Sequence, residues 1–221
     1  MDAVIFDCDG VLVDSEVLAL EIEHATLREF GVAIDPAEYA QLCLGLNEVD
    51  WFAAVGRAAP SLRERMTEFR AVSNARYRAA MESDRLRAID GAQRAVSAVR
   101  GQRAVASSSS SASLRGKLDR TGLLALFDPH VYSADLVARG KPWPDLFAHT
   151  ARSLGVAPAR CVVFEDSVNG VRAARAAGMR VWGFAGGGHM TPAIASDLLA
   201  HGAERVVASW GEAAMLIEQI A

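Results

Sequence analysis

The chain has 221 residues, 51% of them apolar and 23% charged, which is typical of a globular protein that buries a substantial core. Its net charge is −4 and its arginines are scattered, so nucleic acid and anionic membranes are excluded as main partners. No apolar segment approaches the roughly 20 residues that cross a bilayer, and no basic leader sequence is present. We therefore expect a cytoplasmic protein whose three cysteines are reduced.

The first predicted element is a short apolar strand at residues 3–6. Only helical periodicity follows, to about residue 85: Ser15 can cap a first helix, Asp35-Pro36 can begin a second, and a longer helix follows residues 60–61. From residue 90 onward, strands and helices alternate. The expected strands are 103–106, 131–133, 161–164, 180–184 and 205–207, and the expected helices are 114–118, 144–154, 167–178 and 210–220.

This alternation predicts an α/β fold with a doubly wound, Rossmann-like parallel sheet. The strand at 3–6 must join that sheet, because it has no partner nearby in the sequence. The helical stretch is then an insertion after the first strand. We expect a core of residues 1–14 and 86–221 and an inserted all-α domain of residues 15–85.

Two carboxylates, Asp7 and Asp9, directly follow the first strand. Side chains alternate along a strand, so both are expected on one side and Cys8 on the other. Gly10 allows a sharp turn after them. Two acids this close imply a cation between them or a shifted pKa in one of them. The run therefore predicts a site for chemistry.

The next strands also end in polar residues. Ser107 ends the second strand and opens a run of five serines that includes Ser108; Lys141 follows the third strand, and Glu165-Asp166 ends the fourth. Alone, a serine run is typical of a linker and a lysine of the surface. However, ligands of open parallel sheets bind at the carboxyl ends of the strands. Because these polar residues all follow strands that end at one edge of the sheet, the pattern favours a single site there that can hold an anion.

The run from Asp7 to Glu16, followed by Ser107, Lys141 and Glu165-Asp166, resembles the haloacid dehalogenase-like (HAD) hydrolase superfamily. The closest resemblance within it is to the phosphatase and β-phosphoglucomutase-like group. It covers the whole chain, and it implies that residues 1–14 and 86–221 are a HAD-like catalytic core. Residues 15–85 would be a helical cap that selects the substrate and closes over it.

The resemblance implies hydrolysis of a phosphate ester through an aspartyl-phosphate. Asp7 would be the nucleophile, and Asp9 the general acid and base. The resemblance also implies that phosphate is bound by Ser107, Ser108 and Lys141. Mg²⁺ would be bound by Asp7, the Asp9 main-chain carbonyl, Asp166 and Glu165, where Glu165 either contacts the ion directly or contacts its ligands. The substrate would be contacted by Glu16, Asn47 and Glu48 of the cap. The expected substrate is a small sugar or polyol phosphate, and the expected assembly a monomer or weak homo-oligomer.

Several alternatives remain at this stage. Strand alternation points Cys8 away from the phosphate. His24 is interpreted as a surface or cap-core residue, and His189 as a residue near a strand end that could approach the site without a catalytic role. In the mutases of the family, a cap histidine and a cap arginine stand where this chain has Ala19 and Glu48, which favours a phosphatase over a phosphotransferase. A non-catalytic, receiver-like phospho-acceptor is disfavoured by the Asp-x-Asp spacing and the insertion. A dehydrogenase is disfavoured because no Gly-x-Gly-x-x-Gly motif is present.

Overall fold

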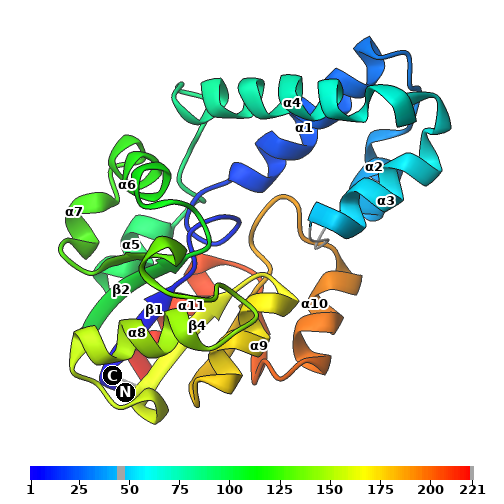
Figure 1. Ribbon diagram of the computed structural model, residues 1–221. Helices are drawn as coiled ribbons and strands as arrows, with labels where there is room; N and C mark the ends of the chain where they lie inside the picture. The colour runs from blue at the N-terminus through cyan, green and yellow to red at the C-terminus, as the bar shows by residue number, and fades with distance from the viewer. Residues whose placement is uncertain (44–47, 220–221) are drawn as a thin grey trace. The chain divides into compact units, whose positions relative to one another are not determined.

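The computed structural model describes residues 1–43 and 48–219, and the chain divides into two compact units. One unit comprises residues 1–14 with 87–221, and the other comprises residues 15–86 (Figure 1). We call them the sheet unit and the helical unit. No helix in the described ranges is both long and apolar enough to span a membrane.

The sheet unit is built on six parallel strands in the order β3-β2-β1-β4-β5-β6. The strands are β1 (Ala3–Phe6), β2 (Gln102–Ser107), β3 (Val131–Ser133), β4 (Cys161–Glu165), β5 (Arg180–Phe184) and β6 (Arg205–Val207). All six lie where the sequence predicts them, and the predicted doubly wound sheet is confirmed. The strand order reverses beside β1, and ligands of such sheets bind at this reversal.

Helices cover both faces of the sheet, as Figure 1 shows for α8 and α9 in front and α11 behind. The helices of this unit are α5 (Ala92–Ser97), α6 (Ser111–Arg120), α7 (Leu124–Phe127), α8 (Asp145–Leu154), α9 (Val168–Ala176), α10 (Pro192–Ala200) and α11 (Trp210–Gln219), with short 3₁₀ turns at Ala134–Leu136 and Pro158–Arg160. The sequence did not predict α5, α7 or α10. Apolar residues of α8, α9 and α10 join one buried cluster with Ala3 and Ile5 of β1.

The opposite face of the sheet carries an aromatic core. The ring of Phe6 stacks on that of Phe164 with centroids 5.5 Å apart, and Trp210 of α11 lies 5.0 Å from Phe164. Trp210 Nε1 also donates a hydrogen bond to the carbonyl of Val11, 2.9 Å away. Because Val11 belongs to the turn after β1, this bond anchors the segment that carries both aspartates.

The helical unit contains α1 (Ser15–Glu29), α2 (Pro36–Cys43), α3 (Glu48–Ala58), a 3₁₀ turn (Pro60–Arg65) and α4 (Met66–Met81). Its core includes Trp51 and Phe69, whose rings stack with centroids 5.9 Å apart. Glu23 of α1 accepts hydrogen bonds from Tyr39 and Arg70, each 2.8 Å long. These contacts join α1, α2 and α4 around one interior.

Candidate active site

The turn after β1 holds Asp7 and Asp9 at the carboxyl edge of the sheet. The amide of Gly10 donates to the carbonyl of Val13 at 2.9 Å, which closes the turn. Gly10 has a φ of +71°, a conformation that favours glycine. A Cβ at this position would lie 1.9 Å from Asp166 Oδ2. Glycine therefore allows both the turn and the close approach of Asp166.

The residues Asp7, Lys141, Glu165 and Asp166 form a buried group that we call the Asp7 cluster. Lys141 Nζ donates to Asp7 Oδ1 and to Glu165 Oε1, and both distances are 2.5 Å. The exposed fractions of these three side chains are 9% for Asp7, 5% for Lys141 and 0% for Glu165. Lys141 thus contacts two of the three carboxylates, and the four side chains carry an excess of two negative charges when all are ionised.

Glu165 is held at both ends of its carboxylate. Its Oε1 accepts from Lys141, and its Oε2 accepts from the amide and the hydroxyl of Ser167 at 3.3 and 3.0 Å. A Cβ on Gly170 of α9 would lie 1.9 Å from the Glu165 carboxylate carbon, so the carboxylate occupies the place of a side chain. This arrangement favours a role for Glu165 in orienting Lys141.

His189 contacts the Asp7 cluster from the segment between β5 and α10. Its Nε2 lies 2.9 Å from Asp166 Oδ2, and both side chains are buried. From sequence, His189 was expected near a strand end, within reach of the site but without a catalytic role; it stands five residues beyond the end of β5. This contact restrains the Oδ2 atom of Asp166, which directly follows β4.

The electrostatics of the cluster follow from burial. Burial raises the pKa of Asp7 to about 7, although Lys141 opposes this shift. Burial also raises the pKa values of Glu165 and Asp166. Burial alone would lower the pKa of Lys141, but Asp7 and Glu165 outweigh it and the pKa is raised. Lys141 therefore stays charged beside carboxyl groups whose pKa values burial raises.

The oxygen donors of the Asp7 cluster fit a divalent metal cation. Asp7, Glu165 and Asp166 each offer a carboxylate oxygen, and these three oxygens lie within 4.8 Å of one another. Carboxylate oxygens are the ligands preferred by Mg²⁺ and other hard divalent ions. Both the chemistry of the donors and their excess charge are therefore suited to a divalent metal.

A second group, the Asp9 cluster, comprises Asp9, Lys117, Ser107 and Ser109. Lys117 Nζ of α6 lies 2.5 Å from Asp9 Oδ1, and Ser109 Oγ lies 2.9 Å from Asp9 Oδ2. Ser107 Oγ is 3.4 Å from Asp9 Oδ2. The sequence singled out Ser107 but neither Lys117 nor Ser109. Ser108, predicted to bind phosphate, is exposed.

The remaining predicted residues belong to the helical unit or play no polar role. Glu16 lies in the first turn of α1 and Glu48 is the first residue of α3, whereas Asn47 lies outside the described residues. His24 Nε2 is 2.8 Å from the carbonyl of Ile34. Cys8 is buried, and burial raises the pKa of its thiol well above the ordinary value, so it is a poor nucleophile.

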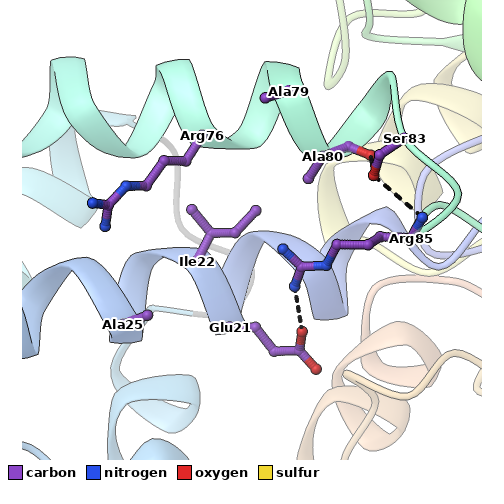
Figure 2. A pocket seen from close by; sticks show the side chains of 8 residues that line it. All are labelled: Glu21, Ile22, Ala25, Arg76, Ala79, Ala80, Ser83 and Arg85. Carbon is purple, nitrogen blue, oxygen red and sulfur yellow. Dashed lines mark hydrogen bonds and ion pairs between the residues drawn. The ribbon is translucent and has the colours of Figure 1, made fainter.

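The helical unit also has a groove of about 390 Å³ between α1 and α4 (Figure 2). Two hydrogen bonds lie within its lining: Arg85 Nη2 donates to Glu21 Oε2 at 3.0 Å, and the amide of Arg85 donates to Ser83 Oγ at 3.2 Å. Ile22 lies between them and Arg76. This lining offers no acid cluster of the kind seen in the sheet unit.

The paired acids stand where the strand order of this doubly wound sheet reverses, which is where such sheets bind their ligands. Residues 1–178 match the haloacid dehalogenase-like hydrolase family. The 6-phosphogluconate phosphatase of Escherichia coli is 30% identical over 88% of this chain and 87% of its own length. The chain belongs to the haloacid dehalogenase-like hydrolases, and this prediction from sequence is confirmed.

Solved structures agree with this membership. A HAD family hydrolase from Deinococcus radiodurans, determined with bound phosphate and sodium, is 36% identical and has a TM-score of 0.84, covering 100% of this chain and 97% of that one. A candidate β-phosphoglucomutase from Thermotoga maritima is 28% identical with a TM-score of 0.75, covering the whole of both chains. The predicted resemblance to the phosphatase and β-phosphoglucomutase-like group is therefore also confirmed.

Proposed function

We propose that this protein is a Mg²⁺-dependent phosphatase that hydrolyses a small phosphorylated metabolite through an aspartyl-phosphate on Asp7. The observation that carries the proposal is the pairing of two aspartates, two residues apart, with two different buried lysines. One aspartate lies in an acid-rich group suited to a metal, and the other lies outside that group. A nucleophile and a proton-transfer group need such different surroundings.

In the first step, an Asp7 carboxylate oxygen attacks phosphorus and the bond from phosphorus to the substrate oxygen breaks. Asp9 donates a proton to the departing oxygen, which leaves as the alcohol. In the second step, water attacks the phosphoryl group of Asp7 while Asp9 takes up a proton from that water. The bond between phosphorus and Asp7 then breaks, and inorganic phosphate is released with Asp7 restored.

Lys141 orients and partly neutralises Asp7, and its ammonium is suited to a phosphoryl oxygen as well. Glu165 keeps Lys141 in place. Asp7 and Asp166, with Glu165 as ligand or neighbour, would hold Mg²⁺, which when bound would offset the repulsion between a carboxylate and an anionic phosphate. Ser107, at the end of β2, is proposed to bind a phosphoryl oxygen once a substrate displaces its contact with Asp9.

The substrate is proposed to be a sugar or polyol phosphate, supported by the relative that acts on 6-phosphogluconate. We assign selection of that substrate to the helical unit acting as a cap, with Glu16 and Glu48 as its candidate polar contacts. A cytoplasmic location is consistent with the three free, buried cysteines.

A phosphate-release screen tests the proposal. Wild-type protein and Asp7→Asn are assayed on sugar phosphates, polyol phosphates and nucleotides, with Mg²⁺ and with EDTA. We expect release that requires Mg²⁺ and is absent in Asp7→Asn. Release that survives EDTA or the substitution would contradict the mechanism. Interconversion of sugar phosphates without net release would identify a mutase, and a stable phosphoprotein without turnover would identify a phospho-acceptor.

A further inference from the structure

A buried lysine in the Asp9 cluster has no role in the mechanism above. Lys117 lies on α6 with only 3% of its side chain exposed, although lysines are rarely buried. Its Nζ lies 2.5 Å from Asp9 Oδ1 and 3.0 Å from Ser109 Oγ. Resting on the proposed function, we propose that Lys117 is a positioning residue that holds Asp9 in the orientation needed for proton transfer.

The geometry fixes both ends of the Asp9 carboxylate. Lys117 binds Oδ1, while Ser109 Oγ donates to Oδ2 at 2.9 Å. The carbonyl of Ser109 in turn accepts from the Ser133 hydroxyl at 2.6 Å, which ties this serine to the end of β3. The terminal torsion of an aspartate is otherwise broad. Anchors from α6 and from the segment after β2 therefore restrain its rotation.

The chemistry of the anchors also distinguishes the two oxygens of Asp9. An ammonium group has three donors and no acceptor, so the oxygen that it binds must act as an acceptor. Serine hydroxyls both donate and accept. Lys117 therefore fixes Oδ1 as an acceptor, whereas Oδ2 faces the hydroxyls of Ser107 and Ser109, which can donate or accept.

A purely structural role explains the burial of Lys117 less well. Replacing a buried ion pair with apolar residues of similar volume is often neutral or stabilising, so such a pair is weak evidence for stability. The same helix carries an ion pair of the ordinary kind: Arg115 lies 3.0 Å from Asp128, and about half of each side chain is exposed. Lys117 differs in being buried against a carboxylate of the site.

The leaving group of the substrate provides a test. An alkyl phosphate releases a poor leaving group that needs a proton, whereas p-nitrophenyl phosphate releases a stable phenolate that needs little help. Because kcat/KM covers the steps through the first bond cleavage, it separates this requirement from the later attack of water. A residue that acts through Asp9 affects the alkyl ester selectively, and a general structural defect affects both esters equally.

The experiment measures kcat/KM of wild type, Lys117→Met, Lys117→Arg, Asp9→Asn and the double variant on both esters. The alkyl ester is the one hydrolysed fastest in the phosphate-release screen. We expect Lys117→Met to lower kcat/KM by roughly 10²-fold on the alkyl ester and by less than about 10-fold on p-nitrophenyl phosphate. Lys117→Arg should recover part of the loss, and Lys117→Met should add little in the Asp9→Asn background.

Arg115→Met is the matched control on α6, and we expect wild-type kinetics from it. Equal losses on both esters, or full additivity with Asp9→Asn, would overturn the positioning role, as would no loss at all. Failure of the proposed function is distinguishable from these outcomes. In that case wild-type protein would release no phosphate from any ester, or Asp7→Asn would remain active.

Discussion

The Asp7 cluster and the Asp9 cluster lie at the same turn, yet they differ in charge balance. Each aspartate contacts a buried lysine at 2.5 Å. The Asp7 cluster adds two further carboxylates, whereas the partners of Asp9 besides its lysine include two neutral serines. With its carboxylates ionised, the Asp7 cluster therefore carries excess negative charge that a metal cation would offset. In the Asp9 cluster, one carboxylate is balanced by one ammonium group. Two residues of chain separation are enough to create two distinct chemical surroundings.

The largest effect should come from the nucleophile. Asp7→Asn removes the carboxylate that is proposed to attack phosphorus, so we expect kcat to fall by at least about 10⁴-fold. Asp9→Asn should leave more activity than Asp7→Asn on p-nitrophenyl phosphate. Phosphate release and mass detection of the phosphoprotein measure this. Equal residual activity of the two variants on that ester would remove the functional contrast between the clusters.

Removal of each lysine compares the two charge balances directly. Lys141→Met leaves Asp7 and Glu165 without their ammonium partner, and breaking a buried pair typically costs about 3–5 kcal/mol. Lys117→Met leaves one partly buried carboxylate with its serines, so we expect a smaller loss. Urea unfolding in EDTA measures both free energies of unfolding. A larger loss for Lys117→Met would contradict the comparison.

The metal-free protein should lose stability as pH rises from about 4 to 7. The pKa of Asp7 is raised from 3.8 to about 7, so the folded state keeps a proton that the unfolded state has already released. The folded state thus binds more protons in this window, and the linkage relation gives a negative slope of up to a few kcal/mol in all. Thermal unfolding across this pH range should show a flatter profile for Asp7→Asn than for wild type.

Magnesium should stabilise the Asp7 cluster more than the Asp9 cluster, because the only metal contact implied for Asp9 is its main-chain carbonyl. A ligand at 100 times its Kd raises the free energy of unfolding by about 2.7 kcal/mol. We expect a rise in Tm with Mg²⁺ in wild type and in Lys117→Met, and a much smaller rise in Asp166→Asn. Differential scanning fluorimetry measures it. An undiminished rise in Asp166→Asn would show that the ion binds elsewhere.

The smallest effect concerns His189, which contacts Asp166. Loss of a residue that orients a metal ligand typically weakens metal affinity by about 10–100-fold. We expect His189→Ala to raise the Mg²⁺ concentration required for half-maximal activity and stabilisation, and His189→Gln to restore part of the affinity. If calorimetric titration with Mg²⁺ gave the same affinity for His189→Ala as for wild type, the role of His189 would be packing alone.

The strands and the acids were the parts accessible to sequence reasoning. Asp7, Asp9, Lys141 and the Glu165-Asp166 pair could be placed together because the carboxyl ends of parallel strands meet at one edge. In a chain whose strands and helices alternate, the short apolar runs that form β1 and β4 are typical of buried strands. The structure brings Asp7, Lys141, Glu165 and Asp166 together at this edge, whereas Asp9 contacts Ser107 and Lys117 instead.

The missed residues lack any such local signal. Lys117 occurs in a helix where a lysine is ordinarily solvated, and only the packing of α6 makes it buried. Ser109 is one of five adjacent serines, and its choice over Ser108 depends on the turn after β2. α10, which the sequence analysis also missed, did carry a local signal, since Thr191 caps it and Pro192 follows.

The two glycines at the site have a consequence for recognising related sequences. Neither Gly10 nor Gly170 takes part in chemistry, yet each occupies a position where a methyl group would overlap a carboxylate at 1.9 Å. The residues that characterise this site therefore include glycines at positions 10 and 170 as well as the acids and lysines. A search pattern that pairs Asp166 with Gly10, and Glu165 with a glycine five residues later, would separate chains able to house these carboxylates from chains that merely contain them.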